Sequence, residues 1–229
     1  MCLIKLDFFI ILSMNLIKII ILFLFSEWIE NYKYMNKYKT ETKFNVYRSL
    51  MYIYFSLYSL EISINNFDEA YGLPFDYKND DINNLSEWFE SYLLLDIEKM
   101  IVTGNNRFDL YVHHVWCLVS FWIAKYYNKC GYFHIFLLVN EIISVPSGID
   151  SIYLEEGKKY ESMLCKKFRK NIIKNIRLPI WIIVFITTIH HRHDIPSIMF
   201  WNGILTPLLM IYLDNYWLGK CQKVIDEYK

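Results

Sequence analysis

The sequence predicts an all-α protein, a helical bundle that crosses a membrane several times. Of its 229 residues, 55% are hydrophobic and 18% are aromatic, which is high for a soluble domain. Several apolar runs have the length of a membrane span, about 17 to 25 residues. The 24 basic and 24 acidic residues gather between these runs. A net charge of zero argues against a basic nucleic-acid surface, so no nucleic-acid partner is expected.

Seven helices are expected along the chain. Their ranges are 3–25, 44–64, 86–103, 108–127, 132–153, 176–191 and 195–218. The first is expected to be retained as a span, because it ends at Ser26-Glu27-Trp28 without the small-residue cleavage site of a signal peptide. A true start at Met14 would shorten it. Ser86 is the expected N-cap of the third helix.

The later helices carry clearer boundary signals. Pro146 and Gly148 are expected to kink or break the fifth helix near its end. Residues 190–194 form a very short link, so the last two helices are expected to pair as an antiparallel hairpin. Two polar loops are expected, an acidic one at 65–87 and a basic one at 155–177.

The basic residues predict the orientation of the bundle. If the seven helices alternate in direction, eighteen Lys and Arg residues fall on one side and five on the other. Basic residues are enriched on the cytosolic side of membrane proteins. The 155–177 stretch and the C-terminus are therefore expected in the cytosol, and the acidic 65–87 loop on the opposite side.

Ionisable residues inside these apolar helices are the candidate functional residues, because such groups are costly in lipid. They are Asp96, Asp109, His113, His114 and Glu141. The adjacent histidines point about 100° apart on a helix, so one can face a cavity while the other bonds a neighbouring helix. Asp109 lies four residues before His113 and is expected to orient that ring. A purely structural role, in which these groups bond helices together, remains open.

No metal or resident cofactor is expected. The five cysteines include no CxxC pair, so a zinc knuckle or a disulfide framework is not indicated. A second histidine cluster, His190, His191 and His193, lacks the spacings of di-iron membrane oxygenases. It is interpreted as a polar turn at the membrane interface.

An ordered set of motifs resembles the TRAM–LAG–CLN (TLC) domain family. It consists of the segment WFESYLLLD at 88–96, Arg107-x-Asp109 followed by His113-His114, an apolar helix with Glu141, Ser144 and Pro146, and LDNYW at 213–217. The resemblance covers roughly residues 44–220. It implies a six-helix TLC domain there, preceded by an N-terminal helix and basic linker at 1–43 and followed by a short cytosolic tail at 221–229. It also implies an internal membrane, mostly the endoplasmic reticulum, and core helices around a lipid-sized cavity.

The resemblance also implies a function in lipid metabolism. Ceramide synthases of this family acylate a sphingoid-base amine with acyl-CoA, using a His-His pair and two aspartates in a Leu-His-Asp-x-Ser-Asp arrangement. The matching positions here, 139–144, carry one acid, Glu141, and lack the second. This pattern is closer to the smaller TLC-domain proteins, which are linked to membrane lipid composition.

Two classes of function follow from the resemblance. In an acyltransferase, His113 or His114 acts as general base or acyl acceptor, Glu141 or Asp96 orients it, and acyl-CoA is the co-substrate. The basic 155–177 stretch would attract the phosphates of acyl-CoA, although membrane topology alone explains the same charges. The alternative is a non-enzymatic lipid-binding, cargo or translocation-associated protein. Membrane lipids are the expected partners, and a homo-oligomer or a membrane-protein partner is left open.

Overall fold

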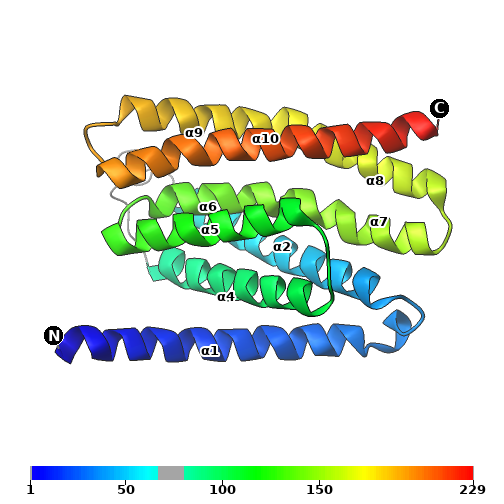
Figure 1. Cartoon of the computed structure of the whole chain (residues 1–229), viewed down its shortest axis with the longest axis horizontal. Coiled ribbons are helices and arrows are strands. Elements are labelled where there is room, and N and C mark those ends of the chain that lie inside the picture. Colours follow the sequence, from blue (N-terminus) through cyan, green and yellow to red (C-terminus); the bar gives the residue numbers. More distant parts are fainter. Residues whose placement is uncertain (1, 67–79, 229) are drawn as a thin grey trace.

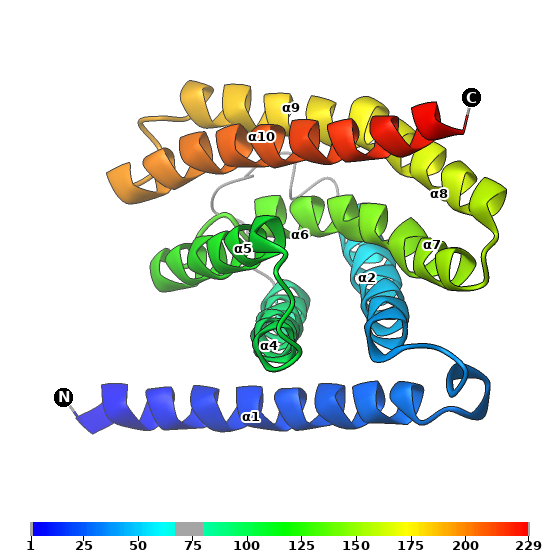
Figure 2. The ribbon, with the colours of Figure 1, turned by 45° about the vertical axis from the view of Figure 1, so that its right-hand side comes forward.

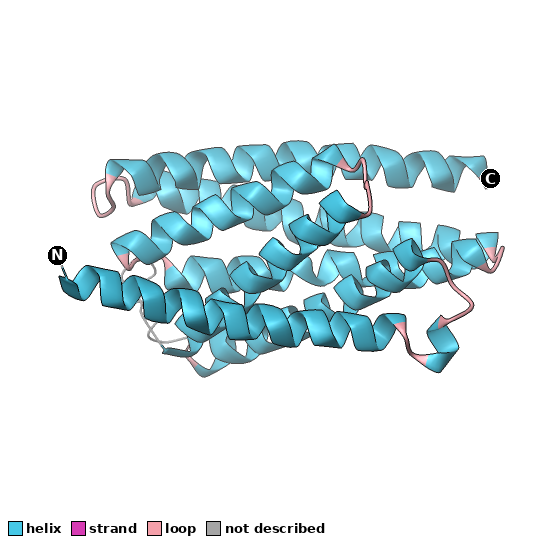
Figure 3. Cartoon of the chain, turned by 60° about the horizontal axis from the view of Figure 1, so that its bottom comes forward, coloured by secondary structure: helices cyan, strands magenta, loops and turns pink. Residues whose placement is uncertain are grey.

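All regular elements in the described chain are helices, which confirms the predicted all-α class. The computed structural model describes residues 2–66 and 80–228. Its helices are α1 (Cys2–Glu30), η1 (Lys33–Met35), α2 (Thr40–Asn65), α4 (Asp80–Val102), α5 (Phe108–Tyr127), α6 (Gly131–Val139), η2 (Asn140–Ser144), α7 (Val145–Glu155), α8 (Lys159–Ile172), η3 (Ile173–Arg177), α9 (Leu178–His190) and α10 (Ser197–Glu227). They form an elongated bundle (Figure 1), and no strand occurs in those two ranges (Figure 3).

Three helical stretches are long and apolar enough to cross a membrane. They are Leu137–Glu155, Lys159–His190 and Ser197–Glu227. The last two pack against each other as α9 and α10, joined by a short turn, and confirm the predicted hairpin. These stretches are the features of an integral membrane protein.

The expectation of a loop over 155–177 is wrong. Helix α8 and the π-helical turn η3 continue directly into α9, so 159–190 is one helical run of 32 residues. Ser162, Met163 and Ile172 are buried along α8, while Lys159 and Lys167 are exposed. A run of charges does not distinguish a loop from the polar face of an amphipathic helix, and here the charges belong to such a face.

Helix α4 begins earlier than the sequence suggested. It starts at Asp80 instead of residue 86, and Ser86 lies inside it. Asp80 and Asp81 occupy the first turn, where the positive end of the helix dipole favours acidic side chains. Residues 67–79 of the expected acidic loop lie outside the described residues.

Helix α1 lies along one side of the bundle and packs against α4 (Figure 2). Two lysines join them. Lys18 Nζ lies 2.7 Å from Glu87 Oε2 and 3.1 Å from Asn84 Oδ1. Lys99 Nζ lies 2.6 Å from Glu30 Oε1. These ion pairs give α1 a specific register against α4, and they explain a lysine in the middle of an apolar helix.

One end of the bundle collects the basic connections. The α1–α2 linker, the α7–α8 turn and the C-terminus lie at the right-hand end in Figure 1, and the α4–α5 turn lies on the same side but nearer the middle. The Glu156 carboxylate in the α7–α8 turn accepts from Lys158 of the same turn at 2.7 Å, and from Tyr38 and Lys37 of the α1–α2 linker at 2.5 and 2.9 Å. These three donors lower the pKa of Glu156 to about 2. The α1–α2 linker and the α7–α8 turn are therefore joined by an ion pair and a hydrogen bond.

Helices α2 and α7 approach each other closely at Gly148. A Cβ atom built there would lie 2.3 Å from Ser49 Oγ and 2.7 Å from the carbonyl oxygen of Asn45. The Gly148 N–H donates to Ser49 Oγ at 3.0 Å. Any side chain at this position would push α7 away from α2.

We therefore expect Gly148→Ala to destabilise the protein by about 1–3 kcal/mol, the usual cost of overpacking. Gly219→Ala is the matched control, because nothing lies within 4 Å of a Cβ added there and alanine favours a helix. Thermal unfolding of the purified protein in detergent measures both. Equal stability of the two variants would contradict the close approach.

Candidate functional site in the bundle core

The two adjacent histidines both point into the bundle. His113 and His114 lie on the second turn of α5 and are 4% and 1% exposed. Their ring centroids are 5.4 Å apart, with the planes at 55°. His114 faces α4 and His113 faces η2 and α10. The expected divergence of the two rings is confirmed, and each ring belongs to a different cluster.

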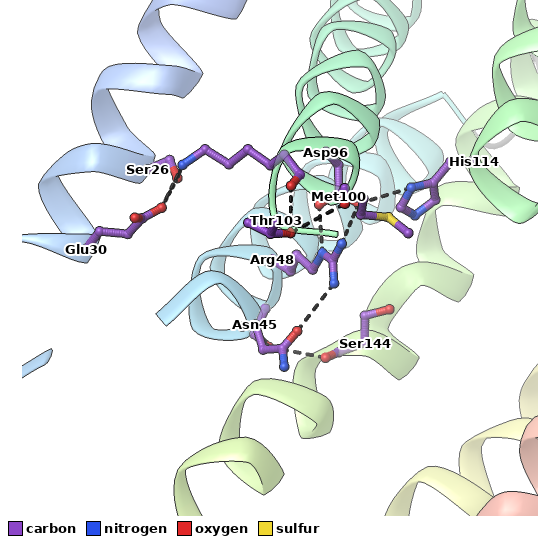
Figure 4. A network of polar contacts seen from close by, with 11 residues as sticks. Ser26, Glu30, Asn45, Arg48, Asp96, Met100, Thr103, His114 and Ser144 are labelled. Atoms are coloured by element: carbon purple, nitrogen blue, oxygen red, sulfur yellow. Dashed lines mark hydrogen bonds and ion pairs between the residues drawn. The ribbon is translucent and has the colours of Figure 1, made fainter. Parts of the chain in front are cut away.

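The cluster at His114 is a closed set of ion pairs (Figure 4). Asp96 Oδ2 lies 3.0 Å from His114 Nδ1. Arg48 donates two hydrogen bonds to the same carboxylate, from Nε to Oδ1 at 2.7 Å and from Nη2 to Oδ2 at 3.0 Å. Asp96 is fully buried. Each oxygen of this carboxylate therefore has at least one protein partner at 3.0 Å or less.

The cluster at His113 is looser. His113 Nε2 lies 3.6 Å from Glu141 Oε1, and Nδ1 lies 3.4 Å from Met210 Sδ. Cys117 Sγ is 3.8 Å from Nδ1. His113, Cys117 and Glu141 line the same cavity of about 30 Å³, which has room for a water molecule or two. The imidazole and the carboxylate thus face a common space that a small polar molecule can enter.

A second buried arginine, Arg177, lies close to Glu141. Arg177 Nη1 is 3.9 Å from Glu141 Oε1, and it donates to the Asn140 carbonyl at 2.9 Å. Its Nε pairs with Asp214 Oδ1 at 2.9 Å, and Trp181 Nε1 donates to Asp214 Oδ2 at 2.9 Å. Arg177 and Asp214 are fully buried.

Three buried carboxylates and two buried guanidinium groups surround the histidines. The carboxylates are Asp96, Glu141 and Asp214, and the guanidinium groups are those of Arg48 and Arg177. Asp96 and Asp214 each pair with an arginine at 2.7–3.1 Å. Glu141 has His113 and Arg177 only at 3.6 and 3.9 Å, so it is the carboxylate with the weakest pairing of the three.

The predicted pairing of Asp109 with His113 is wrong. Asp109 accepts from Arg107 Nη2 at 2.6 Å and from Trp217 Nε1 at 2.7 Å, and Lys220 Nζ lies 3.8 Å away. These groups surround the Asp109 carboxylate. The link between Asp109 and His113 is indirect, because the Trp217 ring that Asp109 binds meets the His113 ring edge-on at 5.8 Å.

Asn140 is the polar residue of the site whose bonding is least complete. Its side chain is fully buried, yet neither amide atom has a hydrogen-bond partner among the described residues. An unsatisfied buried polar atom costs about 1–3 kcal/mol. Together with Glu141 beside it, this amide is available to a bound water or ligand.

The sequence identified four of the central residues and missed two. Asp96, His113, His114 and Glu141 do meet in the core, whereas Arg48 and Arg177 were assigned to the basic ends of the bundle. The cavity at His113 is also far smaller than the lipid-sized cavity that the TLC resemblance implies, since small-molecule sites measure about 300–1,000 Å³. Comparisons of the chain with models of protein families, with curated proteins and with solved structures give no match.

We expect Asp96→Asn to lower the free energy of unfolding by about 3–5 kcal/mol, because it leaves Arg48 buried without a counter-charge. Glu90→Gln is the matched control on the same helix. Glu90 is also buried, but one of its carboxylate oxygens has no hydrogen-bond partner in the described ranges. Unfolding in detergent compares them, and an equal loss from both variants would contradict the supporting role of the Arg48–Asp96 pair.

Proposed function

We propose that this chain is a multi-pass membrane protein of lipid metabolism in which His113 and Glu141 form an acid–base centre. The observation that carries the proposal is that these two groups face one cavity at 3.6 Å. The other two acids of the core are already held by arginine at 2.7–3.1 Å. The pair is thus the part of the buried network that is free to exchange a proton with a ligand.

The outward faces of the remaining helices support a six- or seven-span arrangement. On α2, Leu57, Leu60 and Ile64 are exposed, and α1 exposes Leu16, Ile20 and Leu24. Apolar side chains in rows on the surface indicate contact with lipid. The basic end of the bundle is then cytosolic, which would place the C-terminus there. The resemblance to TLC proteins favours the endoplasmic reticulum or another internal membrane.

An apolar groove next to the site supports a lipid ligand. It measures about 340 Å³ and lies between α7 and α8, lined by Val145, Pro146, Ile149, Leu164 and Phe168 among others. Val145 and Pro146 follow directly after η2, which carries Glu141. An acyl chain in this groove would bring its head group towards the core.

The reaction class that fits the resemblance is acyl transfer to an amine. The amine nitrogen attacks the carbonyl carbon of an acyl thioester such as acyl-CoA, a C–N bond forms and the C–S bond breaks. His113 takes the proton from the nitrogen and returns it to the leaving thiolate. Glu141 orients the ring and stabilises its charged form.

A non-enzymatic lipid-binding or cargo role is the second candidate, and the small size of the cavity favours it. A space of about 30 Å³ at His113 excludes an acyl thioester unless helices move. The single acid at 139–144 favours the same role. In this case the histidines and acids act through stability alone, and the groove between α7 and α8 binds the lipid. Partner proteins and oligomeric state belong to this proposal as open alternatives.

The test is lipid profiling of cells that express the wild type, His113→Gln or Glu141→Gln. We expect the wild type to change acylated lipids such as ceramides, and each variant to lose that change while its membrane level stays normal, since both substitutions conserve shape and remove the acid–base group. His190→Gln is the control, because His190 lies exposed at the end of α9. Equal lipid changes from all four proteins would exclude catalysis and leave lipid binding.

A further inference from the structure

Three cationic side chains adjoin the hydrogen-bonded pair Asp109–Trp217. Arg107 precedes α5, Arg169 lies on α8 and Lys220 lies on α10. Asp109 is the carboxylate shared by Arg107 and Lys220, at 2.6 and 3.8 Å. Asp109 also accepts the Trp217 N–H, so its capacity to neutralise further charge is used.

Arg169 is the cation without a counter-charge. Its Nε is buried and has no hydrogen-bond partner in the described part of the chain. The guanidinium lies over the Trp217 ring, 5.7 Å from the centroid. Asp150, the acid within its electrostatic range, is already bound by Ser162 at 2.6 Å and by Lys166 at 2.5 Å. Burying such a charge is unfavourable unless an anion accompanies it.

We infer that Arg169, Arg107 and Lys220 form a binding site for a phosphate group. Three cations with one carboxylate leave an excess of two positive charges. A phosphate monoester carries about −1.5 to −2 at neutral pH, so it matches this excess. The planar guanidinium fork also suits phosphate oxygens, which accept charge-assisted hydrogen bonds.

The indole ring of Trp217 links the proposed phosphate site to the buried residues around His113. Trp217 contacts Arg169 on one side, and it contacts Arg177 at 5.7 Å and His113 at 5.8 Å. Trp217 is therefore a common neighbour of Arg169 and of the buried His113. The inference does not depend on catalysis at His113, because it concerns binding and is measured as binding.

Phosphate at this site has two sources, the head group of an anionic lipid or a soluble phosphate compound. The full-length chain in nanodiscs of neutral phosphatidylcholine is titrated with either phosphatidic acid or inorganic pyrophosphate. We expect saturable binding of at least one of them. Arg169→Gln is expected to weaken it about tenfold or more, the worth of a hydrogen bond between charged groups. Lys167→Gln, an exposed lysine on the same helix, is expected to change it less than about twofold.

Each outcome decides the matter. Binding of phosphatidic acid alone assigns the site to a lipid head group, and binding of pyrophosphate alone assigns it to a soluble compound. Equal weakening by Arg169→Gln and Lys167→Gln would mean a diffuse positive surface and would overturn the site, as would the absence of saturable binding. Thermal unfolding without ligand controls for folding, because Arg169→Gln removes an uncompensated charge and should not destabilise the chain.

Discussion

Two buried guanidinium–carboxylate pairs hold the helices of the core together. Arg48–Asp96 joins α2 to α4, and Arg177–Asp214 joins η3 to α10. An isolated ion in an apolar interior is expensive, and a pair offsets that cost only when its geometry is good and its remaining atoms are bonded. The contacts measure 2.7–3.1 Å, and Trp181 Nε1 also donates to Asp214. His114 Nδ1 lies 3.0 Å from Asp96, whereas Arg177 Nη2 has no hydrogen-bond partner among the described residues. Each histidine lies next to one of these arginines, His114 through Asp96 and His113 through Glu141.

Two residues of the site, Arg177 and Glu141, lie in locally distorted stretches of helix. Arg177 is the last residue of the π-helical turn η3, and its side chain is fully buried. If the amphipathic helix α8 continued regularly, a basic residue here would favour a more exposed position. Glu141 lies in the 3-10 stretch η2, which ends just before Pro146. Proline has no N–H to donate and crowds the carbonyl four residues before it. The predicted effect of Pro146 on its helix is thus found on the N-terminal side of the proline, at the acid.

The sequence was sufficient to identify site residues that are unusual in an apolar helix. It was insufficient to identify basic residues that are common near helix ends. A glutamate or a His-His pair in an apolar run stands out, so Glu141, His113 and His114 were found. Arg48 and Arg177 lie among other basic residues near helix ends, where topology alone accounts for them. The spacing of Asp109 and His113 allowed a contact, but spacing does not reveal a competing donor such as Trp217 from a distant helix. The charged residues of α8 were likewise assigned to a polar loop, because a run of charges is also found in loops.

The two halves of the centre differ in how tightly they are bonded, and this difference has a consequence for ligand entry. Asp96 is bound by three short contacts to Arg48 and His114, so this half resists change. Glu141 has its two basic neighbours, His113 and Arg177, at 3.6 and 3.9 Å, beyond the length of a good hydrogen bond. A polar ligand that inserts between these groups replaces weak contacts with short ones and breaks none of the strong ones. Entry at Glu141 is therefore favoured over entry at Asp96, and the neighbouring Asn140 amide lies on the same side.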